Sequence, residues 1–307
     1  MENKKELLKV TNDYVFKRIF GQKGNEDITR GFLRAVTKVE YNNIDLEDTP
    51  ILERDLIENK MGILDVKVVA NKENNIDIEM QVTKSEYIAE RILWYWSKLY
   101  AGSIEKGEGY NSTKKAICIL IADFKLEKLK EIEKYHTKWN IREEEYKNII
   151  LTDRLELHII ELEKLERRNN KSKEEEELLN WCKFIKFPGK VEESIIMKNE
   201  EIKKAKEQLD KISQDKKERR LAELREKAIM DEMAIRDSGY NEGRKEGIEI
   251  GLQQGIHRGI ELGKEEGLKK GKEAEKKSIA QNMLEMKIDK ETISKVTGLT
   301  ISEIDNM

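Results

Sequence analysis

The stretch GILDVKVVANKENNIDIEMQV, residues 62–82, decides the fold. Its first part is an almost unbroken aliphatic run, and its last part alternates strictly between apolar and polar side chains. A polar turn, residues 71–75, separates the two. Two strand-like runs on either side of a short polar turn predict a β-hairpin.

Acidic side chains interrupt both arms of this hairpin. Side chains alternate across a strand, so Asp77, Glu79 and Gln81 share one face of the second arm and the apolar residues share the other. A hairpin of this length brings Asp65 of the first arm beside Glu79. Two adjacent carboxylates on rigid strands suit Mg²⁺, a hard cation that prefers oxygen ligands. Such a metal polarises a phosphodiester and activates a bound water.

Two interpretations of this polar face remain open. Acidic residues are common on strands with one solvated face, so the hairpin can be amphipathic and its carboxylates exposed. Alternatively the face is buried, because Asp65 interrupts a run that is otherwise mostly aliphatic. A buried charge needs a partner or a metal, and Lys67 on the same face is one candidate partner.

Signals before and after the hairpin indicate an α/β core. No proline follows Pro188, so helices are unobstructed beyond it. The apolar periodicity predicts two helices within residues 11–40, one helix at 85–102, and strands at 51–57, 115–122, 148–152 and 155–160.

Composition divides the rest of the chain. Beyond the core, Glu, Lys, Leu and Ile recur at helical spacing, and glycine then occupies every fourth position from Gly239 to Gly271. Two short helices around Gly298 resemble half of a helix-turn-helix, and a helical cap or dimer contact fits them equally well. We expect a core at 1–165, a charged helical extension at 166–238, the glycine repeat at 239–275 and a small helical segment at 276–307.

The glycine repeat requires a physical explanation. Each glycine in a helix interior costs roughly 1 kcal/mol relative to alanine. Close packing between helices of a homo-oligomer offsets that cost, whereas a weakly helical spacer avoids it, and both alternatives remain open. Four residues turn a helix by about 400°, so a single straight interface does not use every glycine.

Bulk properties limit the partners. The 307 residues are 39% charged with a net charge of -3, so contact with DNA would need a local basic patch and metal ions rather than a broad basic face. The three histidines, His136, His158 and His257, are scattered in the sequence, which argues against zinc. A signal peptide and a membrane span are not recognisable, so we expect a cytoplasmic protein with no membrane partner and no small-molecule cofactor.

Several blocks together resemble one family. The stretch TNDYVFKRIFG, residues 11–21, resembles the opening of the Rpn family of recombination-promoting nucleases, also described as transposases. The similarity spans roughly residues 10–165, and the charged tail with its glycine repeat also resembles members of the family. Its further blocks are residues 62–66, 78–81, 91–100 and 107–110.

The resemblance implies an α/β, PD-(D/E)XK restriction-endonuclease-like core, a mixed central sheet flanked by helices, followed by a long charged α-helical extension. It implies DNA as substrate, Mg²⁺ (or Mn²⁺) as cofactor, and endonuclease activity that promotes recombination. By position, Asp65 and Glu79 match the metal-binding acids. Gln81 occupies the place of a lysine in many such enzymes, and it can position the nucleophilic water without supplying positive charge. Whether Lys67 or Lys98 supplies that charge stays open.

Two further residues are candidates for the site. Asp13 either extends a carboxylate toward the site or caps the first helix. Arg91 either contacts phosphate or forms an internal salt bridge with a carboxylate.

The sequence thus favours a Mg²⁺-dependent DNA endonuclease with Asp65, Glu79 and Gln81 as catalytic residues. Because Gln81 replaces lysine, the alternative is a catalytically inactive nuclease fold that serves as a binding scaffold and oligomerises through its helical tail. A transposase proper is less supported, because it usually needs three acidic residues on a different fold.

Overall fold

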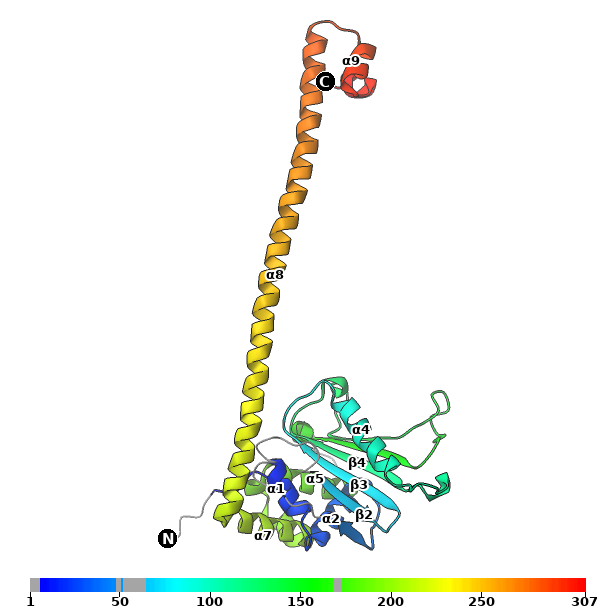
Figure 1. Ribbon diagram of the computed structural model, residues 1–307, viewed down its shortest axis with the longest axis vertical. Helices are drawn as coiled ribbons and strands as arrows, with labels where there is room; N and C mark the ends of the chain where they lie inside the picture. The colour runs from blue at the N-terminus through cyan, green and yellow to red at the C-terminus, as the bar shows by residue number, and fades with distance from the viewer. Residues whose placement is uncertain (1–5, 48–50, 52–64, 168–172) are drawn as a thin grey trace. The chain divides into compact units, whose positions relative to one another are not determined.

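Six strands form one mixed sheet at the centre of the first of two units, residues 1–233 and 234–307 (Figure 1). The computed structural model describes residues 6–47, 51, 65–167 and 173–307. The strand order is β1-β2-β3-β4-β6-β5, in which β3, β4 and β6 run parallel and the remaining neighbours are antiparallel. The strands are β1 Ile44–Leu46, β2 Val66–Ala70, β3 Asn74–Gln81, β4 Lys115–Ala122, β5 His136–Trp139 and β6 Leu155–Glu161.

Helices cover both faces of this sheet, which confirms the predicted α/β class with a mixed sheet and flanking helices. Helix α4 connects β3 to β4 and packs on one face, and α1, α2, α5 and α7 pack on the other with the first turns of α8 (Figure 1). The long charged helix expected after the core is α8. The helices are α1 Asp13–Phe20, α2 Glu26–Thr37, α4 Ile88–Ala101, α5 Lys173–Lys186, α6 Glu193–Lys198, α7 Glu200–Gln214, α8 Lys216–Glu285, α9 Lys290–Thr297 and α10 Ile301–Asp305.

The larger core lies between the sheet and α1, α2 and α5. Strand β3 contributes its even-numbered apolar residues, Ile76, Ile78 and Met80, to this core. Trp181 of α5 is fully buried, with its ring centroid 5.7 Å from that of Phe20 and 5.9 Å from that of Phe32. This aromatic cluster fixes α1 and α2 against the same face of the sheet.

The second unit contains the remainder of α8 followed by two short helices. Residues 230–279 are exposed along their whole length, and an added Cβ atom at any glycine from Gly239 to Gly271 meets nothing within 4 Å. Beyond them, Ala280, Ile293, Leu299 and Ile304 form a small separate core. Self-association through the glycine repeat stays a prediction.

Helix ends in the C-terminal segment are well capped. Gly298 ends α9 with a φ of 71°, a left-handed conformation that glycine adopts without strain. Thr300 then begins α10 in a capping box with Glu303. The Gly turn between two short helices is therefore formed as the sequence indicates.

The local predictions had mixed outcomes. Helix α4 and strands β4 and β6 confirm the elements expected at 85–102, 115–122 and 155–160. The strand expected at 148–152 was wrong: those residues form no strand, and Ile150 makes only an isolated bridge to Arg142. Of the strand expected at 51–57, residues 52–57 lie outside the described residues.

Replacing Trp181 by alanine should lower the free energy of unfolding by about 3–5 kcal/mol, because a large buried ring leaves a cavity between α5 and α1. Urea unfolding followed by circular dichroism measures the loss. The matched control is Leu151→Ala, at a side chain that is 77% exposed, with an expected change within about 0.5 kcal/mol. Equal losses in the two variants would refute the role of this aromatic cluster.

Candidate active site

The β2–β3 hairpin brings the predicted acids together. Val66 pairs with Ile78, and Lys67 pairs with Asp77, so Asp65 immediately before β2 continues the register toward Glu79. On the other side of β3, Glu79 lies beside Leu120 in parallel register. The predicted proximity of Asp65 and Glu79 follows from this pairing.

The polar face of β3 is buried, so the interpretation of a solvated face was wrong. Asp65, Asp77 and Glu79 are each less than one-tenth exposed. The physical reason is α4, which crosses this face and packs Ile88 and Ile92 against the alternate residues of β4. The carboxylates therefore lie in a layer between sheet and helix, where charge is costly unless compensated.

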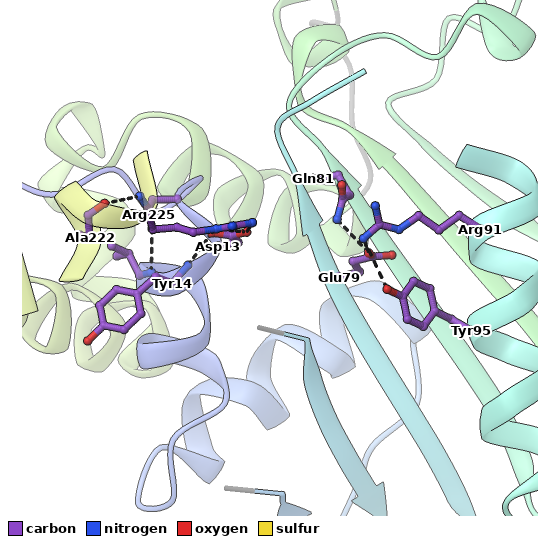
Figure 2. A network of polar contacts seen from close by, with 10 residues as sticks. Asp13, Tyr14, Glu79, Gln81, Arg91, Tyr95, Ala222 and Arg225 are labelled. Atoms are coloured by element: carbon purple, nitrogen blue, oxygen red, sulfur yellow. Dashed lines mark hydrogen bonds and ion pairs between the residues drawn. The ribbon is translucent and has the colours of Figure 1, made fainter. Parts of the chain in front are cut away.

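Arg91 of α4 contacts Glu79 directly. Its Nη2 atom forms an ion pair with Glu79 Oε1 and lies 3.4 Å from the Tyr95 hydroxyl (Figure 2). Gln81 Nε2 donates a hydrogen bond of 2.8 Å to the same Glu79 oxygen. Of the two interpretations of Arg91, the internal salt bridge is the contact that forms.

Some polar atoms of this cluster have no partner. Among the described residues, Asp65 Oδ2, Asp77 Oδ1 and Arg91 Nε are buried without a hydrogen bond. Burial raises the pKa of Asp65 to about 6, against the opposing charges of Arg91 and Lys17. Burial and then the Asp65 charge raise the pKa of Glu79 to about 7. The same two causes raise the pKa of Asp77 well above its usual value.

These properties fit a hard divalent cation. A bound dication would satisfy an unpartnered carboxylate oxygen, and its charge would oppose the rise in pKa that burial and neighbouring negative charge cause. Within the described part of the chain, no three His, Cys, Asp or Glu side chains form a ready-made metal cage. Mg²⁺ nevertheless needs only one or two carboxylates, because it keeps several water ligands. Asp65 and Glu79 are the residues that suit it.

Asp13 does not cap α1. Asn12 is the N-cap, and its side chain accepts a hydrogen bond from the Val15 amide at 3.3 Å. The Asp13 carboxylate pairs with Arg225 of α8, whose Nη2 lies 2.6 Å from Asp13 Oδ2. Figure 2 shows this pair and the Glu79 cluster as separate groups of contacts. Asp13 acts on the site through its charge, which adds to the rise in the pKa of Asp65.

Sequence reasoning did not identify three contributors to the surroundings of the site: Lys17, Tyr95 and Arg225. Tyr95 follows Arg91 by one helical turn, so helix geometry alone could have paired them. Lys17 lies in the quoted N-terminal block, but nothing in that block points toward the hairpin. Arg225 is 212 residues from Asp13, and no local pattern connects them.

The structure also joins two histidines that are separate in the sequence. His136 Nε2 lies 2.8 Å from His158 Nδ1, and His158 Nε2 lies 2.8 Å from Glu156 Oε1. Lys115 and Lys138 complete the cluster as ion-pair partners of Glu156. Burial lowers the pKa of His136 to about 3, and burial also lowers the pKa of His158.

Comparisons with known proteins agree with this geometry. A family model described as PD-(D/E)XK nuclease family transposase matches residues 10–239, well over half of the chain. A second model, described as the C-terminal HTH domain of the Rpn/YhgA-like nuclease family, matches residues 273–307. No curated protein and no solved structure gives a significant match.

The raised pKa of Glu79 predicts a pH-dependent stability. Below about pH 4.5 the carboxyl is protonated in both states. Between there and about pH 7 only the folded chain keeps its proton, so the metal-free protein loses stability as the pH rises. Glu79→Gln removes this group, and its stability relative to wild type should increase through the window by up to a few kcal/mol.

Urea unfolding in EDTA between pH 4.5 and 8, on wild type and Glu79→Gln in parallel, measures this difference. Titration of the buried histidine pair is common to both proteins and cancels. A difference that stays flat with pH would contradict the raised pKa.

Proposed function

Because the chain belongs to the PD-(D/E)XK nuclease family transposases, we propose that it is a Mg²⁺-dependent DNA endonuclease that promotes recombination, with its site at Asp65 and Glu79. One observation carries the proposal: two buried carboxylates lie together, Asp65 just before β2 and Glu79 on β3, and an oxygen of Asp65 has no hydrogen-bond donor among the described residues. Such an arrangement costs stability, and a role in the function of the protein explains why it is kept.

Asp65 and Glu79 are the residues that would hold the cation. When bound, the metal polarises the scissile phosphodiester and lowers the pKa of a coordinated water. Mn²⁺ suits the same oxygen ligands. The protein's own part is to keep the two carboxylates fixed, at the start of β2 and on β3, in a layer that α4 covers.

Gln81 and Arg91 orient the Glu79 carboxylate. Both contact Oε1, which fixes the carboxylate's rotation and leaves Oε2 outside these two contacts. Gln81 also has a carbonyl oxygen that is able to accept a hydrogen bond from a water molecule. We assign Gln81 to positioning the attacking water and Arg91 to holding Glu79 in place.

The C-terminal segment would contribute to DNA binding. The helix-turn-helix family model covers residues 273–307, and the small core around Ile293 and Ile304 gives this segment a fixed fold. In helix-turn-helix domains the second helix enters the major groove. DNA affinity would then come partly from this domain and partly from the nuclease site.

The scaffold alternative is favoured by a different observation. Residues 230–279 expose every side chain, and nine glycines in that helix cost on the order of 9 kcal/mol. Packing against further copies of the chain would offset this cost, so we propose homo-oligomerisation through α8. The molecular mass of the intact chain, measured by light scattering, tests it; a monomeric mass at all concentrations would exclude it. A catalytically inactive scaffold would use the same helix.

Asp65→Asn should reduce Mg²⁺-dependent nicking of supercoiled plasmid by about 100-fold or more, the scale of loss when a preorganised electrostatic group is removed. Parallel reactions with EDTA establish the metal requirement. Asp45→Asn, on the edge strand β1, serves as the matched control and should cleave like wild type. Undiminished nicking by Asp65→Asn would exclude the assigned site. Absence of nicking by the wild-type protein would favour the scaffold.

Ile304→Asp should weaken DNA binding by the intact chain, because it places a charge in the small core of the C-terminal segment, where Ile304 is 2% exposed. Val296→Asp, at a position that is 63% exposed in the preceding helix α9, is the control for added negative charge. Fluorescence anisotropy with duplex DNA in EDTA measures both. Equal affinities of the two variants would argue against DNA binding by this domain.

A further inference from the structure

The C-terminal end of α1 approaches the start of β2 unusually closely. At Gly21, the residue that ends α1, an added Cβ atom would lie 3.1 Å from the Val66 side chain and 3.2 Å from Lys17 Cγ. These distances are shorter than an ordinary van der Waals contact, so glycine suits this approach. The aliphatic part of Lys17 therefore packs where β2 begins, next to Asp65.

Lys17 brings its ammonium group to the backbone of Asp65, at the edge of the candidate site. The side chain is buried, with 5% of the residue exposed, and its Nζ atom donates a hydrogen bond of 3.3 Å to the Asp65 carbonyl oxygen. Its positive charge opposes the rise that burial causes in the pKa of both Asp65 and Asp77. A buried lysine whose charge acts on two buried carboxylates is an element of the site rather than of the surface.

Polar contacts from α8 hold α1 in this position. Arg225 pairs with Asp13 at the start of α1, and Glu218 pairs with Arg18, the residue after Lys17, at 2.8 Å. The Asn12 side chain also donates to a backbone carbonyl of α8. Since both ends of α1 are fixed, the Lys17 ammonium is held in one position.

The other candidate lysines do not match this placement. The charge of Lys67 also opposes the rise in the pKa of Asp65 and Asp77. Its side chain, however, is 47% exposed and lies 4.0 Å from Glu47, so solvent screens much of that charge. Lys98 is exposed, with its Nζ atom 4.3 Å from the ring centroid of Trp94. Gln81 brings no positive charge to β3, whereas the buried ammonium of Lys17 on α1 provides one near the same carboxylates.

We propose that Lys17 of α1 supplies the positive charge of the nuclease site, in place of a lysine at the position of Gln81, and stabilises the negative charge that develops on the scissile phosphate. This proposal rests on the endonuclease function proposed above. It gives the N-terminal block, residues 11–21, a role in the reaction as well as in packing.

The test compares Lys17→Met with wild type in two measurements. In plasmid cleavage, kcat should fall by about 100-fold while KM for DNA stays within about threefold, because a charge used in the transition state is lost. In calorimetric titration of the DNA-free protein, Mn²⁺ should bind about threefold more tightly or better, because a cation facing the same carboxylates has been removed. Slower turnover together with tighter metal binding separates this role from a structural one. A disordered site would turn over more slowly and would also bind Mn²⁺ more weakly.

Two further variants complete the experiment. Lys17→Arg keeps the charge and should hold Mn²⁺ affinity within about twofold of wild type. Lys23→Met, at an exposed lysine that follows α1, is the matched control and should leave kcat and Mn²⁺ affinity unchanged. If Lys17→Met does not fold, as judged by circular dichroism, Lys17→Gln takes its place in both measurements.

Unchanged Mn²⁺ affinity in the neutral variant, or a rise of equal size in Lys17→Arg, would overturn the proposal. So would wild-type turnover in Lys17→Met. Failure of the wild-type protein to cleave plasmid would count against the endonuclease function instead, and the Mn²⁺ titration would still decide whether Lys17 faces the metal-binding carboxylates.

Discussion

Burial of three carboxylates in one layer is the constraint on which the rest of this structure depends. Asp65, Asp77 and Glu79 lie between the sheet and α4, where each ionised group lacks most of its hydration. An apolar core would be more stable at these positions. The fold instead surrounds them with compensating groups drawn from other elements, chiefly Arg91 from α4 and Lys17 from α1.

This compensation explains why elements far apart in the sequence belong to one unit. Helix α1 places Lys17 beside Asp65, and α1 is itself held by Arg225 and Glu218 at the start of α8. Helix α5 adds Trp181 beneath α1 and α2. The match of the family model to residues 10–239 is consistent with this, because it includes the first turns of α8 along with the sheet.

Much of the core was predictable because the signal is local. Strict alternation in residues 76–82 gave β3 and its two faces, and the unbroken apolar run at 115–122 gave β4. Short edge strands carry too few residues for a pattern, so β1 and β5 were not predicted, and residues 148–152 were wrongly assigned as a strand. The burial of the polar face was not decidable, because it depends on α4 crossing that face. The Asp13–Arg225 pair and the His136–His158 pair depend on tertiary contacts that no spacing rule encodes.

The absence of a lysine at residue 81 does not by itself decide whether this site is catalytic. A lysine on β3 matters in a nuclease because of where its charge lies, and Coulomb energy depends on distance and burial rather than on the element that carries the group. Here Gln81 hydrogen-bonds the Glu79 carboxylate, while a buried ammonium reaches the site from α1. The two parts that one lysine can perform, orienting a carboxylate and supplying positive charge, would be divided between two residues. A sequence motif that lacks lysine is then compatible with a site that retains its charge.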